Sequence, residues 1–294
     1  MSVATLRCEP PAPATPSPTA DVTTTHGAAT VTFACTDGVS RLAGLYQRDP
    51  LRVLFPAVPE GELPTAVMVT TSGGLVGGDR LDVSVTVGDG ARAMAFGQAA
   101  EKIYRSAGPT SRIDVELSVA GGGWLEGLPQ ETIWFEGARL QRRTRLEVAP
   151  GGRALAGEIL VFGRIAGGER LSRGLVRDAW EVRRGGRLQW ADALHLEDDM
   201  AGVFADPACF DGAVAYGTIV YADDAPARRL DLARSLLGDA AGTRAAATVV
   251  NGVLVARWLG RDAEALRRAY GDFWAAFRAA VAGLPGTLPR LWHM

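Results

Sequence analysis

The chain has 294 residues, of which 47% are hydrophobic and 22% charged, and its net charge is −2. This length supports one large domain or two modest ones, and the charge balance gives no electrostatic reason to expect binding to nucleic acid or to an anionic membrane surface. No window approaches 18 uninterrupted apolar residues, and the first residues do not resemble a secretory signal, so we expect a cytoplasmic protein without a membrane span. The three cysteines and three histidines are scattered, which argues against a disulfide framework and against a metal site built mainly from these residues.

The first 25 residues contain five prolines between Pro10 and Pro18. Such a segment cannot bury a core and is predicted to be a flexible tail. No linker interrupts residues 26–294, so the rest of the chain is predicted to form a single domain.

Short strand-like runs separated by glycine clusters follow one another from residue 28 onwards. This spacing indicates a mainly β fold, antiparallel or solenoid-like, rather than alternating βαβ units. The predicted strands include 91–96, 112–119, 123–125, 132–135, 139–148, 153–162, 175–183, 187–196 and 213–221.

Two segments near the C-terminus have helical periodicity instead. Residues 225–237 place leucines on one face, and Gly238 follows as a C-terminal cap residue. Residues 262–282 are predicted to form a longer helix, with Asp262 as the N-cap and large apolar residues along one face.

A glycine-rich stretch, 70–81 (TTSGGLVGGDRL), connects two predicted strands. It lacks the Gly-Lys-Ser/Thr of a phosphate-binding loop, and a strand rather than a helix follows it, so a nucleotide site is not expected. The four glycines instead predict a β connection with positive φ angles or close backbone approach. Asp79, at the start of the following strand, could bind Arg80 or nearby backbone N–H groups.

Two further clusters carry charged or aromatic groups. Residues 98–106 concentrate Glu101, Lys102, Tyr104 and Arg105, which fits either a solvated edge strand or a docking surface. Glu126 and Glu131 lie near Trp124 and Trp134 and could form a glycosidase-like carboxylate pair, although tryptophans are more often core residues.

Glu158 lies in an otherwise apolar strand. It must therefore be paired, with Arg164 or another arginine, or line a wet cavity, because burying a lone carboxylate is costly. Asp178, next to Arg177, is predicted to be surface charge.

Five blocks of this sequence, in order and spacing, resemble the urease accessory protein UreD family. They are 73–81 (GGLVGGDRL), 102–106 (KIYRS), 128–138 (LPQETI and FEGA), Glu158 with 162–164 (FGR), and 289–292 (PRLW). The resemblance implies a mainly β, solenoid-like fold with two helices and a non-enzymatic role. It implies binding to urease apoprotein and, with UreF and the GTPase UreG, support of nickel insertion into urease. A homodimer within a larger complex is a further expectation.

The family is thought to pass nickel through an internal route, and no tightly bound cofactor is expected. By position, Asp79 and Glu158 match acidic residues of the family blocks, and both could hold a hydrated divalent cation weakly. The best candidates for partner contacts are Lys102, Tyr104, Arg105, Gln130 and Glu131. Residues 61–68 lack the Cys-His pair usual in the family, which weakens any metal site there, and Gly127 replaces an aromatic residue.

One alternative function comes from a different class. A β-solenoid hydrolase or carbohydrate-binding protein would use Glu126 and Glu131 beside the two tryptophans. Loss of nickel from urease when the chain is absent would favour the accessory role, whereas glycan hydrolysis by the purified chain would favour the alternative.

Overall fold

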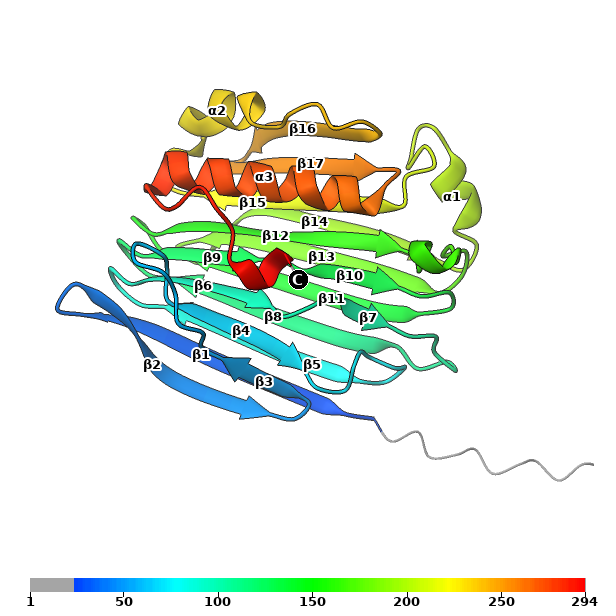
Figure 1. The fold of residues 1–294 in the computed structure, drawn as a ribbon, viewed down its shortest axis with the longest axis horizontal. Helices are drawn as coiled ribbons and strands as arrows, with labels where there is room; N and C mark the ends of the chain where they lie inside the picture. The colour runs from blue at the N-terminus through cyan, green and yellow to red at the C-terminus, as the bar shows by residue number, and fades with distance from the viewer. Residues whose placement is uncertain (1–23, 294) are drawn as a thin grey trace, which may run out of the picture.

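Two β-sheets and a layer of helices form the structure, a computed structural model that describes residues 24–293 (Figure 1). The first sheet, sheet A, has seven strands. In spatial order they are β14 (Arg187–Glu197), β13 (Leu175–Arg184), β11 (Arg139–Val148), β8 (Ser111–Val119), β5 (Arg80–Val87), β1 (His26–Thr36) and β2 (Val39–Arg48).

The second sheet, sheet B, has ten strands. Its main path runs through β16 (Thr243–Val250), β17 (Val253–Gly260), β15 (Ala215–Ala222), β12 (Arg153–Phe162), β9 (Trp124–Leu128), β6 (Arg92–Gly97), β4 (Thr65–Thr70) and β3 (Leu51–Leu54). Two short strands lie off this path, β10 (Glu131–Trp134) between β12 and β7 (Glu101–Ile103).

The chain passes repeatedly between the two sheets, so that successive turns lay parallel strands next to one another. In sheet A, β1, β5, β8, β11 and β13 pair in parallel, and in sheet B the same holds for β4, β6, β9 and β12. Antiparallel hairpins, β1–β2, β13–β14 and β16–β17, lie toward the ends. This winding confirms the predicted mainly β, solenoid-like fold.

Two apolar cores hold the layers together. The first lies between the sheets and the second between sheet B and the long helix α3 (Ala263–Ala282). Asp262 caps α3, because its Oδ1 accepts a hydrogen bond from the N–H of Ala265 at 2.9 Å. Leu266, Phe273 and Phe277 are fully buried on its inner face, and Figure 1 shows α3 lying across sheet B.

The predicted helix at 225–237 is present but interrupted. A 3-10 turn, η2 (Pro226–Arg229), leads into the short helix α2 (Leu230–Ser235). A further short helix, α1 (Ala201–Ala205), and the 3-10 turns η1 (Ile165–Gly167) and η3 (Arg290–His293) were not predicted.

The predicted tail falls mostly outside the described residues, and the single-domain organisation stays a prediction. No helix of the described residues is long and apolar enough to span a bilayer.

Candidate functional site

Sheet B splits at two bends, and a cavity lies between the sheets at this point. The chain bends between β6 and β7 at residues 98–100 and between β9 and β10 at Pro129 and Gln130. The strand pairs β6–β9 and β7–β10 both remain parallel on either side of the bends. The cavity next to the bends has a volume of about 320 Å³, and its wall reaches the surface at Gln98 and Lys102.

The cavity lining combines aliphatic and polar side chains. Strands β5 and β8 of sheet A supply most of the aliphatic part: Leu81, Val83, Val85, Ile113, Val115 and Leu117. Hydrogen-bonding and charged groups form the polar wall, mostly from sheet B and its bends but with Arg142 from β11 of sheet A: Thr70, Gln98, Glu101, Gln130, Thr132 and Arg142.

A buried ionic cluster adjoins the polar wall. Arg142 on β11 binds Glu158 on β12, with 3.1 Å between Nη2 and Oε2, and also binds Asp178 on β13. The Nη1 of Arg142 donates to the hydroxyl of Thr132 at 2.8 Å, and the indole N–H of Trp180 donates to Glu158 at 2.6 Å. The partner of Glu158 is therefore Arg142, and the predicted alternative Arg164 lies instead 3.9 Å from Glu169.

The protonation of this cluster is set mainly by burial. Burial raises the pKa of Glu158 to about 8, the nearby negative charge of Asp178 acts in the same direction, and Arg142 opposes both. Glu158 is therefore harder to ionise than an exposed glutamic acid, and Arg142 is the positive charge that offsets part of this effect. The sequence prediction that Asp178 is surface charge is wrong, because only 2% of its surface is exposed.

Glu101 is a second acidic group of the cavity wall. Its Oε2 accepts a hydrogen bond from the hydroxyl of Thr70 at 2.6 Å. Burial raises the pKa of Glu101 to about 7, while the bond from Thr70 lowers it. Glu101 makes no ion pair with another side chain of residues 24–293, but the more distant positive charge of Arg142 also lowers its pKa.

Asp79 lies away from this cavity and organises the glycine-rich connection. Its Oδ1 accepts from the N–H and the hydroxyl of Thr25, at 2.8 and 2.9 Å, and its Oδ2 accepts from the N–H of Val76 at 2.9 Å. The neighbouring Arg80 binds Asp82 instead. Of the two structural partners considered for Asp79, the backbone N–H groups are the ones observed.

The glycines of this connection are needed for close approach, as predicted. Gly73, Gly74 and Gly78 have positive φ angles. A Cβ on Gly77 would lie 2.2 Å from the hydroxyl oxygen of Ser106. The loop is therefore packed against the segment that follows β7.

The residues predicted to contact partners fall into two neighbouring groups. Lys102, Gln130 and Glu131 line the cavity. Tyr104 and Arg105 follow β7; the Tyr104 hydroxyl donates to the carbonyl of Gly73 at 3.2 Å and Arg105 Nε donates to that of Glu136 at 3.3 Å.

Two of the cavity residues are tied to the C-terminal layer. Arg267 of α3 binds Glu131, with 3.0 Å between Nε and Oε1, and donates to Gln130. The indole of Trp292 in η3 donates to the carbonyl of Pro129 at 2.8 Å. The end of the chain thus lies beside the bend between β9 and β10 (Figure 1).

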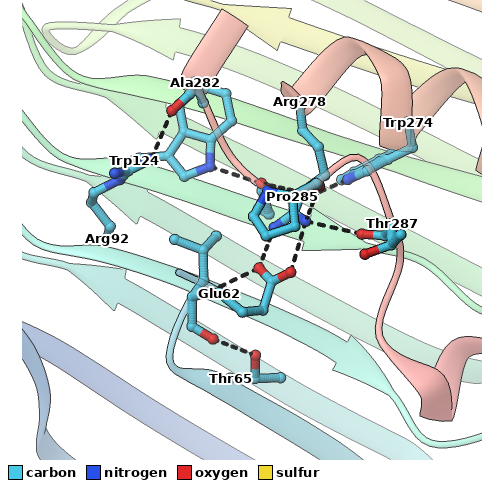
Figure 2. A network of polar contacts seen from close by, with 11 residues as sticks. Glu62, Thr65, Arg92, Trp124, Trp274, Arg278, Ala282, Pro285 and Thr287 are labelled. Atoms are coloured by element: carbon cyan, nitrogen blue, oxygen red, sulfur yellow. Dashed lines mark hydrogen bonds and ion pairs between the residues drawn. The ribbon is translucent and has the colours of Figure 1, made fainter. Parts of the chain in front are cut away.

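The predicted carboxylate pair of Glu126 and Glu131 does not form. Glu126 is fully buried and accepts hydrogen bonds from the indoles of Trp124 and Trp274, each at 2.9 Å, and from Arg278 at 3.0 Å. Trp124 and Trp134 belong to different cores, on opposite faces of sheet B. This prediction is wrong, because Glu126 has no exposed surface and both of its oxygens are already hydrogen-bonded. Figure 2 shows Trp124, Trp274 and Arg278 of this network.

Within residues 24–293, no three side chains of His, Cys, Asp or Glu gather closely enough to hold a metal ion. Arg142, Asp178 and the environment of Glu101 are the features that sequence reasoning missed. Their signal was alternation: Asp178 shares a strand face with Val176, Trp180 and Val182, all of which are buried.

Comparison with known proteins gives one consistent result. A family model described as UreD urease accessory protein matches residues 25–293. A protein named urease accessory protein UreD from Magnetococcus marinus is 44% identical over 273 residues, covering 92% of this chain and 94% of that protein.

Two further relatives, also named urease accessory protein UreD, agree. The one from Rhodopseudomonas palustris strain BisA53 is 45% identical over 259 residues, covering 87% of this chain and 86% of its own length. The one from Methylobacterium strain 4-46 is 43% identical over 260 residues, covering 87% and 90%.

Proposed function

The chain belongs to the UreD family of urease accessory proteins, and from this membership we propose that it binds urease apoprotein and supports nickel insertion together with UreF and the GTPase UreG. The observation that carries the proposal is the family match, which covers residues 25–293. The proposed role is that of a cytoplasmic, non-enzymatic scaffold that acts through protein–protein contacts.

The region around the split in sheet B supports the proposed contacts. Lys102 and Arg105 are exposed there, and Tyr104 packs edge-on against Phe135 at 5.1 Å between ring centroids. A rigid aromatic residue flanked by two cations is typical of an interface anchor. Gln130 and Glu131, held by Arg267, fix the shape of the same surface.

Nickel would be cargo in this role, and Glu158 is the residue best suited to meet it inside the protein. Its carboxyl group lies directly behind the polar wall of the cavity, beside a second carboxylate, Asp178. Arg142 already binds both groups, so an entering cation would have to compete with a guanidinium. Competition of this kind keeps binding weak, which suits an ion in transit.

Asp79 is the weaker candidate for the nickel path. All its described bonds come from groups that hold the glycine-rich loop in place. We propose that its first role is to shape the surface near Tyr104, because that loop packs against residues 102–106.

Co-expression with the urease subunits and the remaining accessory proteins tests the proposal. Without this chain, purified urease should contain its subunits but little nickel, as measured by elemental analysis and urease activity. The chain should also co-purify with urease apoprotein. Full nickel loading in its absence would contradict the accessory role.

Variants then separate docking from transit. Glu158→Gln should lower nickel loading while leaving co-purification intact, whereas Lys102→Ala with Arg105→Ala should lower co-purification. Glu116→Gln, an exposed acid on the outer face of sheet A, is the matched control and should change neither. Unchanged loading with Glu158→Gln would remove Glu158 from the nickel path but leave the accessory role standing.

A further inference from the structure

The exposed apolar side chains of the protein gather at one end. Of the ten large hydrophobic residues exposed in residues 24–293, seven lie between positions 39 and 58: Val39, Leu42, Leu45, Tyr46, Leu54, Phe55 and Val58. They belong to β2 and β3 and to the residues that follow β3. These are the last strands of sheets A and B at the same end of the molecule (Figure 1). A patch of this kind marks an interaction surface.

Strand β2 also has a free edge. It pairs with β1 on one side only, and no other described strand continues sheet A beyond it. Its ten residues, VSRLAGLYQR, contain neither the lysine nor the proline that commonly protect an exposed edge. The unpaired backbone groups of β2 can therefore accept another strand.

The register with β1 assigns each β2 side chain to a face. Leu42 lies opposite Phe33 and Leu45 opposite Val31, and both of these β1 residues are buried in the core between the sheets. Leu42 and Leu45 therefore point toward the inner side. The register shift next to Phe33 leaves Ala43 bulged between the two leucines.

Arg41 and Tyr46 lie on the outer face. Arg41 is opposite Ala34 and Tyr46 is opposite the exposed Thr30. Arg48 continues the same face. Neither Arg41 nor Arg48 makes an ion pair with a side chain in the part of the chain that the structure describes.

We propose that two copies of this chain pair antiparallel through β2, with a two-fold axis between Ala43 and Gly44. In this register Leu42 faces Leu45 of the second copy on the inner side, and Arg41 faces Tyr46 of the second copy on the outer side. The small residues at the axis let the two backbones approach closely. The interface is isologous, so every contact occurs twice.

Self-complementarity is what points to a second copy rather than to another protein. Side chains of one face meet side chains of the same face, and the cation of Arg41 meets an aromatic ring. A slip of one residue would bring Leu42 opposite Tyr46, which lies on the other face. A slip that moves the axis to between Gly44 and Leu45 would bring Arg41 opposite Arg48, two like charges.

Sedimentation equilibrium of the full chain tests this proposal with a matched pair of variants. Tyr46→Glu and Tyr46→Arg both remove the same exposed ring, but only the first places an opposite charge across from Arg41. At low salt we expect the dimer dissociation constant of Tyr46→Arg to be at least about tenfold larger than that of Tyr46→Glu. High salt should reduce this difference between the two variants, because it screens the charges.

Leu188→Arg is the positional control. Leu188 is an exposed apolar residue on β14, the opposite edge of sheet A, and its replacement should leave the dimer intact. Circular dichroism should show that all three variants are folded.

Three results would overturn the proposal. They are a monomeric wild-type chain at its highest soluble concentration, equal dimerisation of the two Tyr46 variants, and disruption by Leu188→Arg alone. Hydrogen exchange of residues 39–48 adds a direct reading, since the dimer should slow exchange there in the isolated chain. Protection that appears only when urease apoprotein is added would assign the edge to that partner instead. The proposal does not depend on the accessory function.

Discussion

Replacing Arg278 with methionine tests how α3 is fixed to sheet B. The guanidinium is fully buried and donates to Glu126, to Glu62 and to the carbonyls of Pro285 and Thr287 (Figure 2). Methionine fills a similar volume but leaves Glu126 buried without its cation. Removing one partner of a buried ion pair costs about 3–5 kcal/mol of unfolding free energy.

The loss should be visible in both chemical and thermal unfolding. For a chain of this size, a loss of that magnitude lowers the melting temperature by roughly 5–8 °C. Urea unfolding followed by tryptophan fluorescence should show a lower midpoint with an unchanged slope. Trp124 and Trp274 donate to Glu126 and so report on the same network.

A double-mutant cycle with Glu126→Gln identifies the cause. If the stranded carboxylate is responsible, Arg278→Met with Glu126→Gln should cost less than the sum of the single variants, by about 0.5–3 kcal/mol. A cost below about 1 kcal/mol for Arg278→Met, or strict additivity of the cycle, would refute the reasoning.

Two further predictions concern the candidate site and its loop. Folding raises the pKa of Glu158 from 4.5 to about 8, so the folded state binds the extra proton and stability should fall as the pH rises through that interval. The fall should be smaller in Glu158→Gln by urea titration at several pH values, and equal pH dependence in the two proteins would contradict the assignment. Gly77→Ala should cost about 1–3 kcal/mol because its Cβ would meet Ser106. Gly202→Ala is the control, because a Cβ at Gly202 would meet no atom within 4 Å. If thermal denaturation gives Gly77→Ala and Gly202→Ala the same melting temperature, the predicted clash with Ser106 is excluded.

Local periodicity predicted the strands and the long helix well. The predicted strands 139–148 and 153–162 coincide with β11 and β12, and the predicted helix 262–282 begins at the cap of α3. These elements depend on alternation, turn glycines and an N-cap, all of which lie within a few residues of one another in the sequence. The arrangement of strands into a solenoid needed the family resemblance as well.

The alternation of side chains between the two faces of a strand no longer predicts the face correctly where the strands bend. Trp124 and Trp134 were grouped as neighbours, but the bend at Pro129 and Gln130 changes which face of sheet B each side chain joins. Nothing in the sequence gives the angle of that bend. The cavity and the separation of Glu126 from Glu131 follow from it, and neither could be predicted.

Buried charged residues were also difficult to predict, because the partner of each one is distant in the sequence. Asp178 becomes recognisable as buried once Val176, Trp180 and Val182 are seen to share its face. Its neighbour Arg142 is known only from the parallel register of β11 with β13. The same holds for Arg278, which lies one helical turn after Trp274 but binds Glu62 from the other end of the chain.

Comparing the two buried arginines explains why only one of them belongs to the candidate site. Each binds two acidic side chains, Arg278 those of Glu126 and Glu62, and Arg142 those of Glu158 and Asp178. Around Arg278 both oxygens of Glu126 are hydrogen-bonded, so the cluster acts as a fixed anchor.

Around Arg142 the bonding is incomplete. Within the described residues, the Nε of Arg142 and the Oδ1 of Asp178 have no hydrogen-bond partner. Arg142 and Trp180 also face the 320 Å³ cavity, so water or an ion can reach the cluster without unfolding the sheet. Buried polar groups left without partners are the ones that an additional ligand can satisfy. This difference in hydrogen bonding, rather than the charge itself, is the reason to place the proposed transit of nickel at Arg142 and not at Arg278.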